Sequence, residues 1–312
     1  MLLHLPQSMF TLAHLSDPHL APLPPARLKE LASKRITGYL NYHRNRARHL
    51  ETDTLEHLIA DLKAQTPDHI AVTGDLINIG LDLEIERAAD WLADLGSPDR
   101  VSLVCGNHDS YVPGVLKKAL TSWQPYLIGD NDAASLSMVS KSRSEVMFPY
   151  VRQRGPLAII GLSSAGATPP FFATGTLGRA QLNRLEELLD DFQATDLFRV
   201  VLIHHPPHPR STSWYKRLTD GASLRRLLRE KQVDLILHGH THKHTKHAID
   251  GPNGPVPVIG VASASSGLSS HRDPASYNLF HLRPNGDRWH CDWEKRCLTA
   301  GGFKSEHRER LS

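Results

Sequence analysis

The sequence predicts an α/β fold, because five short apolar runs alternate with helical patterns and end in polar residues. The runs are rich in Val, Ile and Leu without clean alternation, which is typical of strands in a sheet covered on at least one face. In such folds, functional groups gather beyond the carboxyl ends of the strands. The five predicted strands are residues 10–17, 69–75, 101–109, 198–205 and 233–242.

Helical patterns separate these strands at residues 50–63, 83–95, 179–192 and 222–231. The third has the clearest apolar stripe, with Leu182, Leu185 and Leu189 on one face, which predicts packing on a sheet. After His242 the pattern changes to short strands and turns, and residues 255–297 are predicted to complete the second sheet of a sandwich. Residues 284–287 read as a hairpin turn. The polar tail, residues 301–312, is predicted to be frayed.

Composition limits the protein class. The 312 residues are 40% hydrophobic, which is enough for a sizeable core, and the net charge of +3 does not by itself indicate a nucleic-acid or membrane partner. Three widely spaced cysteines, Cys105, Cys291 and Cys297, exclude a disulfide framework and indicate a reducing cytoplasm. No apolar run is long enough for a transmembrane helix, and no secretory signal is recognised. Met9 is an alternative initiator, which would make residues 1–8 an appendage.

Carboxylate, amide and imidazole groups follow each of the five predicted strands. Glycines precede several of them and permit sharp turns. Any one of these short motifs arises often by chance, but five in this order do not. A mixed oxygen and nitrogen ligand set without thiolate suits manganese, iron, zinc or cobalt. The candidate ligands are Asp17, His19, Asp75, Asn107, His204, His240 and His242.

The order D-x-H, G-D, G-N-H-D, H-H-P, G-H-T-H resembles the calcineurin-like metallophosphoesterase superfamily over residues 10–265. Within it the chain is most similar to the class III cyclic-nucleotide phosphodiesterase branch. The resemblance implies one domain over residues 1–312, folded as a four-layer α-β-β-α sandwich with two mixed sheets. It also implies two divalent cations at the strand ends. One is held by Asp17, His19 and His242, the other by Asn107, His204 and His240, with Asp75 bridging them.

The resemblance further implies a hydrolase that cleaves a phosphodiester by attack of a hydroxide bridging two cations. His108 is the expected catalytic side chain, beside the leaving group. Three alternatives remain: a phosphomonoesterase, a nucleotide-lipid pyrophosphohydrolase and a non-catalytic scaffold. The expected partner is a small-molecule or lipid-linked phosphate ester, and no nucleic acid is expected. Metal identity and oligomeric state stay open.

A basic segment, residues 22–48, is predicted to form a helical insertion near the centre. It is either a solvated hairpin packed on the domain or a lid that receives an anionic substrate or contacts an acidic membrane peripherally. Arg44, Arg46 and Arg48 are its candidate substrate-binding residues. His205 is a further candidate, balanced between substrate contact and strand-end packing. The aromatic loops 165–176 and 206–216 are either further substrate walls or ordinary packing.

Overall fold

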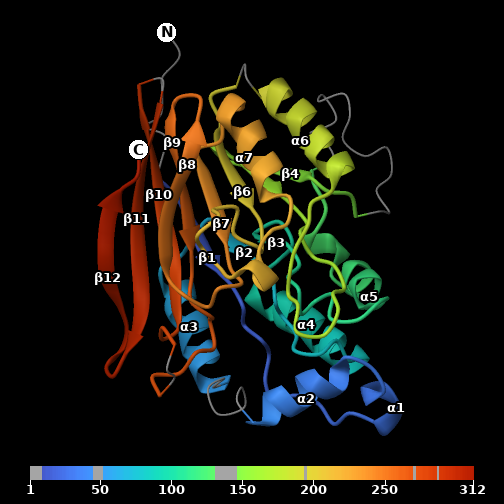
Figure 1. Cartoon of the computed structure of the whole chain (residues 1–312). Coiled ribbons are helices and arrows are strands. Elements are labelled where there is room, and N and C mark those ends of the chain that lie inside the picture. The colour runs from blue at the N-terminus through green and yellow to red at the C-terminus, as the bar shows by residue number, and fades with distance from the viewer. Residues whose placement is uncertain (1–8, 45–51, 131–145, 193–194, 270–271, 287) are drawn as a thin grey trace.

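Two six-stranded sheets lie face to face, with helices on their outer faces (Figure 1). The computed structural model describes residues 9–44, 52–130, 146–192, 195–269, 272–286 and 288–312. Both sheets contain parallel and antiparallel pairs, so the α/β prediction with two mixed sheets is confirmed.

The first sheet has the strand order β12-β11-β10-β1-β2-β3. Strands β1, β2 and β3 run parallel, and their carboxyl ends therefore meet at one edge. β10 pairs antiparallel with β1 and begins a meander through β11 and β12. The bounds are β1 (Phe10–Leu15), β2 (His69–Val72), β3 (Val101–Leu103), β10 (Ser276–Asn285), β11 (Arg288–Thr299) and β12 (Gly302–Arg310).

The second sheet has the order β4-β5-β6-β7-β9-β8, with parallel pairs from β5 to β9 and antiparallel strands at both edges. Its carboxyl ends bring the segments after β6 and β7 toward those of the first sheet. The bounds are β4 (Tyr150–Arg154), β5 (Leu157–Gly161), β6 (Phe198–Leu202), β7 (Leu235–His238), β8 (Thr245–Gly251) and β9 (Gly254–Gly260).

Both faces of the second sheet are covered by apolar side chains. Leu157 and Ile159 of β5 belong to the central core that also holds Leu12 of β1. Ala158 and Ile160 point to the other face and pack with the helices of the outer layer. This two-sided burial explains why the parallel strands read as continuous apolar runs.

The helices form the outer layers, with α3 and α4 on the first sheet and α6 and α7 on the second (Figure 1). The four predicted helices are present within two residues of their expected bounds, over the part of the chain that is described. A further helix, α5, and two 3-10 turns were not predicted. The bounds are α1 (Leu28–Leu31), α2 (Arg35–Arg44), α3 (Thr52–Ala64), α4 (Asp82–Leu95), α5 (Val115–Ser122), η2 (Gln124–Tyr126), α6 (Arg179–Asp191), η5 (Trp214–Lys216) and α7 (Gly221–Glu230).

Two sequence predictions for the C-terminal region were wrong. β9 does join the second sheet, but β10 and β11 extend the first sheet, because β10 pairs with β1. The tail is not frayed: β12 pairs antiparallel with β11 from Thr299 to Asp292. Its polar side chains form cross-strand ion pairs, such as Arg308 with Glu294 at 2.8 Å, that become visible only once the strands are paired.

Candidate metal centre

The loops that follow β1 and β2 are joined by backbone hydrogen bonds. The N–H of Asp17 donates to the carbonyl of Gly74 at 3.0 Å, and the N–H of His19 donates to that of Asp75 at 3.1 Å. This pairing continues the parallel register beyond the strands and places both carboxylates at the same edge of the sheet. Gly106 lets the next loop approach, since a Cβ there would lie 2.2 Å from Oδ1 of Asp75.

Left-handed backbone conformations are concentrated in these loops. Among the described residues, positive φ angles occur at seven non-glycine positions, and five of these are predicted ligands. Such conformations cost about 1–3 kcal/mol each and persist where the surrounding structure imposes them, often at functional sites. The five are Asp17 (52°), His19 (40°), Asp75 (56°), His240 (68°) and His242 (52°).

A first group of side chains surrounds Asp17. Its Oδ1 lies 3.2 Å from Nε2 of His242 and 4.0 Å from Nε2 of His19, and the two imidazole nitrogens are 3.2 Å apart. Nε2 of His19 is also 3.9 Å from Oδ2 of Asp75. These ligand atoms from Asp17, His19, Asp75 and His242 all lie within 4.8 Å of one another, a spacing that one cation can span.

A second group shares Asp75 with the first. Oδ2 of Asp75 lies 3.4 Å from Nε2 of His204. The side-chain oxygen of Asn107 lies 3.2 Å from Nε2 of His204 and 2.8 Å from Nδ1 of His240. Asp75 therefore stands between two clusters, as a bridging carboxylate would.

The electrostatics of both buried carboxylates favour a cation. Burial alone would raise the pKa of Asp75, but the imidazoles of His204 and His108 hold it well below the usual range. Burial is likewise outweighed at Asp17, where His242 lowers the pKa. Oδ1 of Asp17 is buried and has no hydrogen bond of good geometry, although Nε2 of His242 lies 3.2 Å away, and a metal ion would satisfy this oxygen.

Backbone carbonyls orient three of the histidines. Nδ1 of His19 donates to the carbonyl of Ile77 at 3.1 Å, and Nδ1 of His204 donates to that of Thr73 at 2.6 Å. Nε2 of His240 donates to the carbonyl of Lys216 at 2.9 Å. Because each carbonyl can only accept, the ring nitrogen beside it carries a proton, and the opposite ring nitrogen faces the cluster. This is the arrangement found around metal-bound imidazoles, and these residues fit a pair of divalent cations.

Comparison with known proteins places this geometry in a family. The profile of the calcineurin-like phosphoesterase family matches residues 10–244, which covers most of the chain and all seven predicted ligands. The chain belongs to the calcineurin-like phosphoesterase family. It is accordingly a metal-dependent hydrolase of phosphoric esters.

Relatives of this phosphoesterase support the assignment. The chain is 26% identical to a "Probable cyclic nucleotide phosphodiesterase" of Synechococcus sp. strain ATCC 27144, over 73% of this chain and 77% of the relative. A protein with the same description from Synechococcus sp. strain WH7803 is 25% identical over 86% of this chain and 83% of its own length. The fold of this chain is similar to that of a dimetal phosphatase from Danio rerio, with a TM-score of 0.61 and 16% identity. The match covers 98% of this chain and 99% of the Danio rerio chain.

His108 lies beside the centre of the phosphoesterase and is only half-buried. Its ring meets that of His19 edge to face at 4.8 Å and stacks on Tyr111 at 5.3 Å. Nδ1 donates to the carbonyl of Asn78 at 2.5 Å. This contact orients the ring beside the cluster, and the geometry is compatible with the predicted leaving-group role.

The sequence analysis missed Asp109, which organises two of the ligand loops. Its fully buried carboxylate accepts backbone N–H groups from Asp75 at 2.9 Å, Gly106 at 2.8 Å and Leu76 at 2.9 Å. The aspartate that ends the G-N-H-D motif was the available signal. It fixes the loop of Asp75 and belongs to neither ligand cluster, so it is a positioning residue.

Asp109→Asn is expected to destabilise the fold and weaken metal binding together. The NH₂ group that replaces one carboxylate oxygen in asparagine cannot accept a hydrogen bond, so at least one buried N–H is left unsatisfied, at about 1–3 kcal/mol per group. Chemical denaturation and metal titration measure the two effects. Asp82→Asn, on an exposed ion pair with Lys118, is the matched control and should change neither. Wild-type stability and metal affinity in Asp109→Asn would contradict this role.

His205 lies behind the cluster. It is fully buried, Nδ1 is 2.8 Å from the hydroxyl of Ser164, and Nε2 is 3.2 Å from the carbonyl of Ala173. Burial lowers its pKa to about 3, so the ring is neutral. With both ring nitrogens engaged, the geometry favours the packing alternative over substrate contact.

Arg272 is a second residue that the sequence did not reveal. Its Nη1 lies 2.9 Å from Nδ1 of His242, although the side chain is exposed. A guanidinium can only donate, so this contact differs from the carbonyl contacts of the other histidines. Metal binding through Nε2 of His242 requires Arg272 to turn away from Nδ1, and its exposed position permits this.

The basic insertion contacts the centre through a residue that was not singled out. Nζ of Lys34 donates to the carbonyl of Thr168 at 3.0 Å and lies 4.8 Å above the ring of Tyr111, which stacks on His108. Arg44 is exposed at the end of α2. Arg46 and Arg48 lie outside the described residues.

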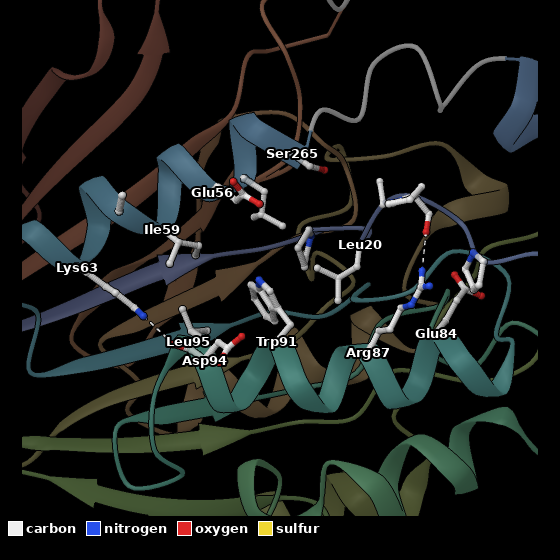
Figure 2. A pocket seen from close by; sticks show the side chains of 16 residues that line it. Leu20, Glu56, Ile59, Lys63, Glu84, Arg87, Trp91, Asp94, Leu95 and Ser265 are labelled. Carbon is white, nitrogen blue, oxygen red and sulfur yellow. Dashed lines mark hydrogen bonds between the residues drawn. The ribbon is translucent and has the colours of Figure 1, made fainter.

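A hollow of about 530 Å³ lies on the other side of the segment that carries Asp17 and His19. It is lined by apolar and charged side chains from α3 and α4, and Pro18 and Leu20 reach it from the metal loop. Figure 2 shows Trp91 and Leu20 directed into this space. None of the predicted metal ligands lines it, so it is separate from the metal centre.

In the described part of the chain, no helix combines the length and apolar character that a membrane span requires.

Proposed function

We propose that this phosphoesterase hydrolyses a phosphodiester at two divalent cations bound by the two clusters. The observation that carries the proposal is the position of Asp75 between two ligand groups, with His108 half-exposed beside them. In this proposal one cation is held by Asp17, His19 and His242. The other is held by Asn107, His204 and His240, and Asp75 contacts both.

When bound, two such cations would lower the pKa of a coordinated water and neutralise charge on the phosphoryl group. The protein's own contribution is positional. Carbonyls of Ile77, Thr73 and Lys216 hold the rings of His19, His204 and His240, so these three ligands need little rearrangement. Asn107 supplies a neutral oxygen, which limits negative charge beside an anionic substrate. His108, oriented by the carbonyl of Asn78, presents Nε2 to the departing oxygen and delivers or stabilises a proton there.

The diester preference is supported by the names of the two cyanobacterial relatives and by the order of motifs. Among diesters, cyclic nucleotides are the first class to test. The metal ligands alone would also serve a phosphomonoesterase or a nucleotide-lipid pyrophosphohydrolase, because they bind only the phosphoryl group. We further propose a single domain and a reducing, cytoplasmic setting, in keeping with the three buried free cysteines.

A substrate panel on protein reconstituted with manganese, iron, zinc or cobalt tests the proposal. The panel comprises bis(p-nitrophenyl) phosphate, p-nitrophenyl phosphate, cyclic nucleotides and nucleotide-diphosphate lipids. The expected result is a higher kcat/KM for the diesters than for the monoester. Preference for the monoester or for the diphosphate lipid would replace the proposal with the corresponding alternative. Absence of hydrolysis with every metal would favour the scaffold.

The basic insertion is proposed to select substrate without performing chemistry. Changing Arg44, Arg46 and Arg48 to glutamine should raise the KM of a large anionic diester while leaving kcat for bis(p-nitrophenyl) phosphate nearly unchanged. Added salt should mimic the change, since exposed charges are screened over about 8 Å at physiological ionic strength. Arg226→Gln with Arg229→Gln, on the exposed face of α7, is the control. An unchanged KM across the panel would remove these arginines from substrate binding.

A further inference from the structure

Large apolar side chains project into solvent on three segments that border the metal centre. Leu28 is 89% exposed, Phe171 85% and Trp214 65%. Ile36 and Leu40 are also exposed and lie four residues apart on α2, so they share one face of that helix. Together with Phe172 these side chains form what we call the apolar rim: Leu28, Ile36, Leu40, Phe171, Phe172 and Trp214.

Contacts between the segments make the rim one surface. Nζ of Lys34 donates to the carbonyls of Thr168 at 3.0 Å and Phe172 at 3.3 Å, which ties the insertion to the loop that carries Phe171. The ring of Phe172 meets that of Trp214 edge to face at 5.5 Å. The rim is also fixed to the centre, because the carbonyl of Lys216, in the same turn as Trp214, accepts Nε2–H of His240.

The charged residues of the same segments are nearly all positive. Residues 22–44 contain five lysines and arginines and a single acid, Glu30. Residues 208–219 contain three lysines and arginines and no acid, and residues 165–176 carry no charge. The whole chain, in contrast, has a net charge of only +3, so positive charge is concentrated beside the apolar rim. Exposed aromatic and aliphatic groups amid cations are the composition of surfaces that bind anionic membranes peripherally.

We propose that the apolar rim docks on an anionic phospholipid bilayer, with Phe171, Trp214 and Leu28 entering the interface and the surrounding cations contacting headgroups. The strong outward projection of these side chains fits insertion into a soft surface better than lining of a closed pocket. Self-association through the rim is disfavoured, because two copies would bring like charges together. The proposal does not depend on which ester the metal centre hydrolyses.

Vesicle co-sedimentation of the 312-residue chain tests the proposed docking on a bilayer. Vesicles of phosphatidylcholine with 30 mol% phosphatidylglycerol should bind the protein, and pure phosphatidylcholine vesicles should bind it much more weakly. The double variant Phe171→Ser with Trp214→Ser should lose binding by about tenfold or more, given the apolar area removed. The double variant Lys29→Gln with Lys216→Gln should bind anionic vesicles about fivefold more weakly for each charge removed. Added salt should weaken binding of the wild type in the same way, because it screens these charges. Leu83→Ser, an exposed leucine on α4, is the matched control and should bind as wild type.

Circular dichroism and thermal unfolding verify that each variant is folded. Equal binding to neutral and anionic vesicles, or undiminished binding by the folded rim variants, would overturn the proposal. Absence of binding to either vesicle by the folded wild type would also overturn it. A concentration-dependent dimer that the double variant abolishes would assign the rim to a second copy of the chain instead. Because sedimentation requires no catalysis, these outcomes are distinct from failure of the proposed phosphodiesterase activity.

Discussion

Asp75→Asn is expected to reduce phosphodiester hydrolysis by about 10³-fold or more and to weaken binding of both cations. Asp75 is the residue shared by the two clusters, with Oδ2 3.9 Å from His19 and 3.4 Å from His204. Metal ions supply several kcal/mol of charge stabilisation in such sites, and each 1.36 kcal/mol is a tenfold change in rate. Asparagine keeps the shape of the side chain while removing its charge. Metal titration and steady-state kinetics measure the two effects.

The comparison with His19→Ala gives this prediction its specificity. His19 belongs to one cluster only, so its replacement should weaken binding of one cation and leave the affinity for the other cation close to that of the wild type. His204→Ala should do the same for the second cluster. Circular dichroism verifies that the Asp75→Asn variant is folded like the wild type. Equal and mild effects of Asp75→Asn and His19→Ala on both binding events would contradict the bridging assignment.

His108→Ala is expected to lower turnover by about 10² to 10⁴, the usual range for acid–base assistance, with two cations retained. The ring is half-exposed beside His19, and its Nδ1 is committed to the carbonyl of Asn78. Its contribution to a departing alkoxide should shrink when the leaving group is already a good one. The loss should therefore be smaller for bis(p-nitrophenyl) phosphate than for a cyclic nucleotide.

His57→Ala, an exposed histidine on α3, provides a matched control and should leave both substrates unaffected. Metal content decides between the two possible roles of His108. Loss of a cation on replacement would make His108 a ligand and would require a different division of the cluster. An equal loss of turnover for good and poor leaving groups would argue against proton delivery.

The sequence predicted the positions that converge because the residues follow strands whose ends must meet. Asp17, Asp75 and Asn107 each follow a parallel strand of the first sheet, and His204 and His240 follow parallel strands of the second. Their types and order were visible in the chain. Their left-handed backbone was not, because Asp and His adopt positive φ more often than most residues but only where the surrounding structure imposes it.

The residues that the sequence missed act through partners far along the chain. Asp109 was visible as part of a motif, but its bonds to the N–H groups of Asp75 and Leu76 depend on two loops meeting. Arg272 approaches His242 from a loop thirty residues away. Lys34 reads as one cation among many until its contact with Thr168 is known.

The missed strand β12 has a similar explanation. β12 is polar along its length and resembles a solvated tail, but at the edge of a sheet polar side chains are compatible with pairing. Its register with β11 brings Arg308 to Glu294 and Arg310 to Asp292. These cross-strand pairs exist only in the folded sheet, so local sequence could not indicate them.

Metal content at saturation, measured by elemental analysis after removal of free metal, tests the central claim most directly. The wild type should retain two divalent cations per chain, and His19→Ala should retain about one, because Asp75 and the second cluster remain intact. The same samples should hydrolyse bis(p-nitrophenyl) phosphate in proportion to the fraction that carries both ions. A wild type that saturates at one cation per chain, with full activity, would contradict the two-cation account.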